Sequence, residues 1–68
     1  MEVRRRVGLN LKRLRIEKGL SQEEFAFRSG IHRTYISGVE RGIRNPTVTI
    51  LEKIAIGLGV PAGRLLDD

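Results

Sequence analysis

Four residues between positions 33 and 38 could contact another molecule from one side of a helix: Arg33, Thr34, Ser37 and Gly38. An arginine guanidinium can donate two parallel hydrogen bonds to guanine O6 and N7, and a threonine methyl group can touch a thymine methyl. The other side chains are small, as a helix requires if it is to enter a major groove about 12 Å wide. These residues therefore predict a helix that reads base edges.

Gly38 has two interpretations. Glycine inside a helix costs about 1 kcal/mol relative to alanine, so something else must favour it or the helix must tolerate it. Its missing side chain either lets the helix lie close to base edges or has no function. The residue alone does not choose between them.

A second group of polar residues is placed to contact the DNA backbone. Gln22 stands at the expected start of a helix, whose free amides and positive dipole end favour a phosphate. Arg41, Arg44 and Asn45 follow the recognition helix and its loop. Such contacts position a protein on DNA without reading its sequence.

The net charge of +5 is unevenly distributed along the chain. Residues 1–44 carry 11 Lys and Arg against 5 Asp and Glu, whereas residues 45–68 carry 2 against 3. A basic surface at one end suits a polyanion, although a solvated basic helix would give the same count.

The spacing of apolar residues and helix-ending signals predicts a compact all-α domain of five helices over residues 1–68. Such a short chain has room for one domain with one small core. The predicted helices cover Val3–Lys18, about 22–29, about 32–41, 48–58 and a short segment after Pro61 that holds Leu65 and Leu66. On the fourth helix, an apolar stripe runs through Val48, Leu51, Ile54, Ala55 and Leu58.

The second and third predicted helices form a pair. Ser21 and Glu24 have capping-box spacing, in which each side chain accepts a hydrogen bond from the other residue's amide. Gly30 suits the turn between the helices. Ile36 and Val39 face the core, which leaves the base-reading side chains, Gly38 included, pointing outward.

Several function classes lack the residues they need. His32 is the only histidine and cysteine is absent, so we expect no metal site, no cofactor and no enzyme active site. No apolar run approaches the roughly 20 residues that span a bilayer. The absence of cysteine fits a cytoplasmic protein. The first helix also resembles an Arg-rich targeting or membrane-surface helix, but its apolar spacing continues into the core.

Three strings of residues carry a family resemblance: L-S-Q-E-E-F-A, G-I-H-R-T-Y-I-S-G-V-E-R-G and R-N-P-T. They resemble the helix-turn-helix family of Cro and phage-repressor type over roughly Leu11 to Leu66. The middle string is also similar to the controller proteins of restriction-modification systems, which are small dimeric regulators of their own operons.

This resemblance implies a homodimeric, sequence-specific transcriptional regulator on a pseudo-palindromic operator in double-stranded DNA, without a small-molecule substrate. It implies base contacts by Arg33, Thr34 and Ser37, a phosphate contact by Gln22 and a position for Tyr35 against the DNA backbone. It further implies an ion pair between Arg15 and Glu40 beneath the recognition helix.

The chain departs from the family pattern at Ile56 and Gly57, where a polar residue and alanine are common. Because Ile50 and Ile56 fall outside the main apolar stripe, we expect them to join Leu65 and Leu66 in a dimer contact. Scattered surface apolarity is the alternative interpretation.

Two other functions remain open. One is an antitoxin that binds a partner protein, although such a chain usually carries an added segment and this one ends two residues after Leu66. The other is an RNA- or membrane-binding module, for which exposed stacking aromatics and a continuous apolar face are missing.

Overall fold

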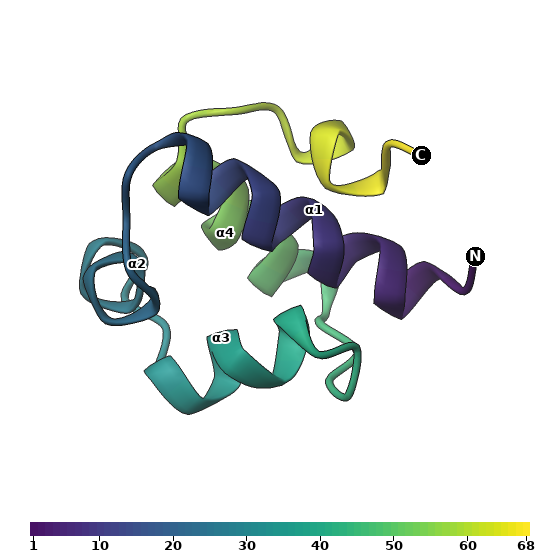
Figure 1. Ribbon diagram of the computed structural model, residues 1–68, viewed down its shortest axis with the longest axis horizontal. Helices are drawn as coiled ribbons and strands as arrows, with labels where there is room; N and C mark the ends of the chain where they lie inside the picture. Colours follow the sequence, from purple (N-terminus) through teal and green to yellow (C-terminus); the bar gives the residue numbers. More distant parts are fainter.

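Five helical elements follow one another in the computed structural model, which describes all of residues 1–68 (Figure 1). They are α1 (Val3–Glu17), α2 (Gln22–Ser29), α3 (Arg33–Glu40), α4 (Val48–Leu58) and the 3₁₀ helix η1 (Ala62–Leu66). The predicted all-α class is confirmed. The fifth predicted helix is a single 3₁₀ segment, so the domain has four α-helices rather than five.

The start of α2 is fixed by its own side chains. Ser21 Oγ accepts a hydrogen bond from the Glu24 amide at 3.0 Å, and Glu24 Oε1 accepts one from the Ser21 amide at 2.9 Å. The predicted capping box is therefore present. The hydrogen bond that the Ser21 amide donates to the charged carboxylate lowers the pKa of Glu24. Thr47 caps α4 in the same manner, because its Oγ1 accepts from the Ile50 amide at 3.2 Å.

The turn between α2 and α3 depends on Gly30, which adopts the left-handed conformation with φ of +72°. Residues with a Cβ rarely adopt this conformation. The Gly30 amide donates to the Ala26 carbonyl at 2.9 Å, and Ile31 then enters the core. The chain thus turns sharply within a few residues, so that α3 lies across the view in Figure 1 while α2 is seen end-on.

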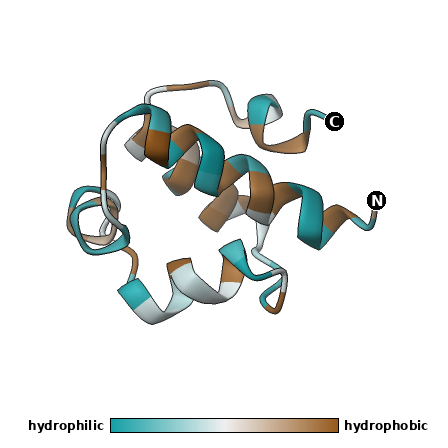
Figure 2. Cartoon of the chain, in the orientation of Figure 1, coloured by the Kyte–Doolittle hydropathy of each residue, from teal (hydrophilic) through white to brown (hydrophobic).

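The core lies between α1, α2, α3, α4 and η1, and Figure 2 shows the hydrophobic stretches of α1 and α4 in the middle of the molecule. Ile36 and Val39 are fully buried, as predicted, and Phe25 is fully buried as well. The buried apolar residues are Val7, Leu11, Leu14, Phe25, Ala26, Ile31, Ile36, Val39, Ile54, Ala55, Leu58 and Leu65.

Two predictions about apolar residues are wrong. Val48, predicted on the buried stripe of α4, is exposed, because it stands at the first position of the helix, beyond the edge of the core. Leu65, predicted in a dimer contact, is fully buried within the monomer. The 3₁₀ geometry of η1 turns Leu65 inward and leaves Leu66 outside.

Contact between α1 and α3 requires a glycine on α1. A Cβ on Gly8 would lie 2.3 Å from the Val39 carbonyl oxygen and 2.8 Å from that of Glu40. Both are backbone atoms, which cannot move aside without displacing α3. Gly8 therefore sets how closely α3 approaches the rest of the domain.

The C-terminal segment is attached to α1 by a buried amide. Asn10 Nδ2 donates to the Leu65 carbonyl at 2.8 Å and to the Asp67 carbonyl at 2.6 Å. Arg6 also pairs with Asp68 at 2.9 Å. In Figure 1, η1 consequently runs beside the amino-terminal half of α1, and both chain ends lie on one side of the molecule. None of the helices combines the length and apolar composition needed to cross a membrane.

The substitution Gly8→Ala is expected to destabilise the domain by about 1–3 kcal/mol, because the new methyl group overpacks against backbone carbonyls. Gly63→Ala is the matched control, since a Cβ there meets nothing within 4 Å and its φ is not positive. Urea denaturation measures both free energies of unfolding. Equal stabilities for the two variants would contradict this account of the α1–α3 contact.

Candidate nucleic-acid interface

Five of the polar residues predicted to read bases or to contact phosphate lie together on one face of the molecule. Arg33 and Thr34 are exposed at the start of α3, and Ser37 is half-buried one turn later. A shallow hollow of about 140 Å³ is lined by Gln22, Arg33, Thr34, Ser37 and Arg41 and contains no hydrophobic residue. The structure thus brings together side chains from α2 and α3 that the sequence assigned separately.

The first turn of α3 is held by His32, which stands at the N-cap position. The Thr34 amide donates to His32 Nδ1 at 3.2 Å, and the Thr34 hydroxyl lies 2.8 Å from the same atom. These contacts satisfy an amide that the helix itself leaves free. The helix predicted from about residue 32 therefore begins at Arg33, and the ring of His32 steadies the turn that carries Arg33 and Thr34.

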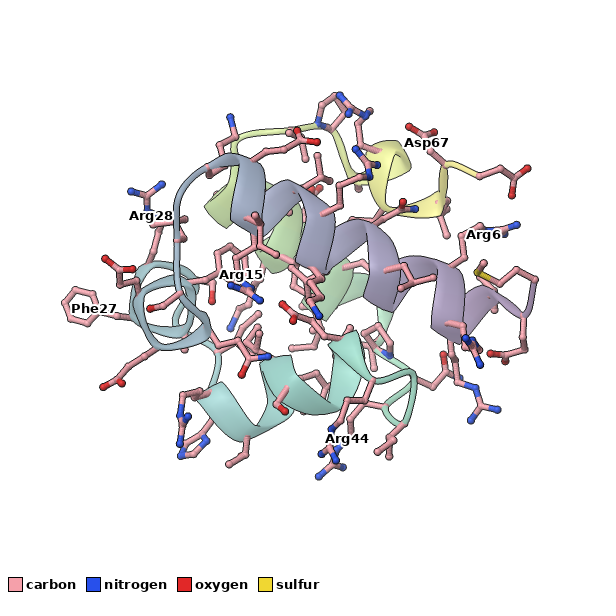
Figure 3. The ribbon with its side chains drawn as sticks, in the orientation of Figure 1. Arg6, Arg15, Phe27, Arg28, Arg44 and Asp67 are labelled. Atoms are coloured by element: carbon pink, nitrogen blue, oxygen red, sulfur yellow. The ribbon has the colours of Figure 1, made fainter.

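The predicted ion pair between Arg15 and Glu40 is present and nearly buried, with side-chain exposures of 10% and 4% (Figure 3). Arg15 Nε donates to Glu40 Oε2 at 2.6 Å and Nη2 donates to Oε1 at 3.0 Å. Its remaining nitrogen, Nη1, donates to the Leu20 carbonyl at 2.7 Å. The hydrogen bonds to Glu40 raise the pKa of Arg15, although burial opposes the charge.

Gln22 joins the same network from α2. Its Nε2 donates to Glu40 Oε1 at 3.0 Å while the side chain lines the hollow on the outer face. The amide is therefore already oriented at the junction of α2 and α3. Its contact with a phosphate stays a prediction.

Gly38 does not face outward, and the prediction that it does so is wrong. It is buried on α3, and a Cβ at this position would lie 2.6 Å from Arg44 Cγ. The Arg44 side chain covers it and reaches the Tyr35 ring, with the guanidinium carbon 5.5 Å from the ring centroid. Figure 3 shows the end of Arg44 beyond the ribbon of α3. Arg44, Arg41 and Asn45 are exposed.

The residues predicted to form a dimer contact do not share one environment. Ile56 and Leu66 are exposed over 71% and 46% of their surface, and Ile50 is half-buried against the core. Leu65 lies behind them as a core residue. The exposed part of the predicted contact is therefore Ile56 and Leu66.

Sequence reasoning missed Phe27, whose side chain is 89% exposed on α2 and points away from the domain (Figure 3). It borders a hollow of about 710 Å³ with Leu20, Ser21 and Glu24. Helical spacing could have indicated its position, because Phe25 is buried two residues earlier and residues two apart face different sides of a helix. Gly8 and Asn10 were also missed, since each acts on a distant segment.

No group of His, Asp and Glu side chains is arranged to hold a metal ion. The helix α3 is short and has a polar outer face. The tight turn at Gly30 joins it to α2, and the amino end of α2 lies beside α3. This arrangement defines a DNA-binding helix-turn-helix domain. The family model described as "Helix-turn-helix" matches residues 11–65, and the chain belongs to the helix-turn-helix family of DNA-binding transcriptional regulators.

Relatives cover nearly the whole chain. It is 55% identical over 60 residues to the uncharacterised HTH-type transcriptional regulator y4dJ of Sinorhizobium fredii, spanning 88% of this chain and 78% of the relative. It is 46% identical over 68 residues to the control protein C.MunI of a Mycoplasma species, spanning 98% and 92%.

The structure also resembles the restriction-modification controller protein C.Esp1396I, which was solved as a tetramer in complex with its natural 35 base-pair operator. The TM-score is 0.85 at 37% sequence identity, with 98% of this chain and 99% of that chain covered. The resemblance to controller proteins that the residues suggested is confirmed.

Removing one partner of the buried pair, in Glu40→Ala, is expected to destabilise the domain by about 3–5 kcal/mol, because it leaves the Arg15 charge uncompensated. Glu17→Ala is the control, since it removes the exposed pair between Arg13 and Glu17 and should cost less than about 1 kcal/mol. Thermal unfolding measures both. Similar losses in the two variants would show that the pair is not effectively buried.

Proposed function

We propose that this protein is a transcriptional regulator of the restriction-modification controller type that acts as a homodimer on a pseudo-palindromic DNA operator. The observation that carries the proposal is the polar hollow on the outer face of α2 and α3, where Gln22, Arg33, Thr34, Ser37 and Arg41 meet. The controller relatives named above support the narrower assignment.

In the proposed complex, α3 enters the major groove with its amino-terminal turn toward the bases. Arg33 donates two hydrogen bonds to a guanine, and Thr34 and Ser37 contact neighbouring base edges. One good bidentate contact is worth about 1–3 kcal/mol of discrimination against the wrong base. We therefore expect Arg33 to contribute more than Thr34 or Ser37 to the free-energy difference between matched and mismatched DNA.

The other polar residues fix the orientation of α3 on the duplex. Gln22 and the amino end of α2 face one phosphate, and Arg41, Arg44 and Asn45, at the carboxyl end of α3 and in the loop after it, face other parts of the backbone. Tyr35 lies against the backbone beside Arg44. These groups supply affinity that depends on salt rather than on base sequence.

Dimerisation is proposed to involve Ile56 and Leu66, with Ile50 at the edge of the contact. Burial of exposed apolar side chains between two copies is favourable at roughly 25 cal/mol per Å² of apolar surface. A two-fold dimer presents two copies of α3 to half-sites one helical turn apart, about 34 Å. The operator symmetry then follows from the protein symmetry.

The protein is proposed to act in the cytoplasm, without a cofactor or an enzymatic step. Of the relatives reported above, y4dJ is an HTH-type transcriptional regulator and C.MunI is a control protein. No observation favours the antitoxin function considered as the alternative.

The substitution Arg33→Ala is expected to relax base preference at one position in each half-site, by about 1–3 kcal/mol. Arg44→Ala should instead weaken binding to all DNA sequences by a similar factor and make the salt slope shallower by about one. Binding isotherms on matched and substituted duplexes at several salt concentrations measure both. Identical effects from the two variants would contradict the assigned roles.

Ile56→Glu is expected to shift the protein toward monomer, because two carboxylates would be buried without partners in the contact. Phe27→Glu is the matched control, since Phe27 is an exposed apolar residue on α2, outside the proposed contact. Sedimentation equilibrium gives the dimer dissociation constant of each. Unchanged dimerisation of Ile56→Glu would rule out this contact.

A further inference from the structure

We infer that Gly38 is a positioning residue for Arg44: its missing side chain lets Arg44 lie against α3 with the guanidinium beside the Tyr35 ring. The inference rests on the proposed function, which places Arg44 at the DNA backbone. On this inference, Gly38 does not contact a base, and glycine is not needed at this position for its backbone conformation.

Space is the reason for glycine at this position. A Cβ on residue 38 would lie 2.6 Å from Arg44 Cγ, 3.5 Å from Nε and 3.6 Å from Cδ. Gly38 is not among the glycines with positive φ, so its backbone would accept alanine. Alanine would also favour the helix by about 1 kcal/mol. Only the path of the Arg44 side chain excludes a methyl group here.

The backbone fixes where that side chain begins. The Gly38 carbonyl accepts hydrogen bonds from the Ile43 amide at 2.9 Å and from the Arg44 amide at 3.1 Å. The chain after α3 is therefore folded back onto the helix, and Arg44 starts directly beside Gly38. From there its side chain crosses the glycine to reach Tyr35, which lies on the same face of α3 because the two residues are three apart.

The guanidinium is held at the edge of the DNA-facing surface by this arrangement. Its central carbon lies 5.5 Å from the centroid of the Tyr35 ring, within the range of a cation–π contact. Preorganising a long arginine side chain reduces the rotamer freedom that it loses when it binds a phosphate. Gly38 thus contributes to DNA affinity without touching DNA.

A methyl group at Gly38 would displace Arg44 rather than unfold the domain. The atoms it meets belong to an exposed, flexible side chain, which can turn into solvent. A Cβ on Gly8, by contrast, would meet backbone carbonyls of α3, which cannot move unless the whole helix is displaced. Gly38→Ala should therefore keep a cooperative unfolding transition while its Arg44 guanidinium leaves the Tyr35 ring.

The first test needs no DNA. In NMR spectra of the wild-type protein, the Arg44 Hδ and Hε signals should be displaced by the ring current of Tyr35, and Tyr35→Leu should remove that displacement. Gly38→Ala should remove it as well, with the remaining core signals unchanged. Arg44 signals that stay at their wild-type positions in Gly38→Ala would overturn the inference.

The second test is a double-mutant cycle on DNA affinity with Gly38→Ala, Arg44→Ala and the combined variant. Gly38→Ala should weaken binding to operator and unrelated DNA by equal factors and make the salt slope shallower by up to about one. Added to Arg44→Ala, it should cause no further loss, because the truncated side chain at position 44 has none of the atoms that the new methyl meets.

The outcomes separate the inference from the proposed function. Additive losses, or a lower ratio of operator to unrelated binding in Gly38→Ala, would show an action independent of Arg44 and overturn the inference alone. Unchanged DNA affinity in Arg44→Ala would overturn the backbone contact of the proposed function, and the role of Gly38 in DNA affinity with it.

Discussion

The nearly buried pair of Arg15 and Glu40 is the interaction on which the position of the recognition helix depends. Arg15 comes from α1, and its three nitrogens bind Glu40 at the end of α3 and the carbonyl of Leu20 before α2. Gln22 completes the network from α2. Burial of Ile36 and Val39 decides which face of α3 meets the core, but the hydrophobic effect itself is non-directional. The paired charges fix the rotation of α3 more closely, because a small rotation would leave a charge unpaired.

Two glycines complete the placement of the DNA-facing surface, and each acts through the absence of a side chain. Gly8 lets α1 approach the backbone of α3, which brings the recognition helix to its required depth. Gly38 lets Arg44 fold back over α3, which places a positive charge beside Tyr35. The first acts on the fold and the second on the surface. One glycine in a helix can therefore be a packing requirement and another a functional one.

Local signals are sufficient to predict the helices. The capping box of Ser21 and Glu24 involves residues three apart, so its geometry can be read directly from the sequence. The burial of Leu65 cannot be read from the sequence in this way. A 3₁₀ helix has fewer residues per turn than an α-helix, so each side chain points in a different direction. Helical spacing misplaces Gly38 for a different reason: its partner Arg44 approaches from the following loop, and helical spacing carries no information about loops. The residues proposed to read bases can be identified from type and spacing alone, since exposure at the start of a helix is a local property.

Selection of bound duplexes from a pool of random DNA shows whether a dimer reads DNA through two copies of α3. We expect enrichment of one sequence with two-fold symmetry, whose half-sites are centred about 34 Å apart and contain a guanine that is lost from the consensus selected by Arg33→Ala. Enrichment of a single asymmetric site, or no enrichment above the starting pool, would contradict it.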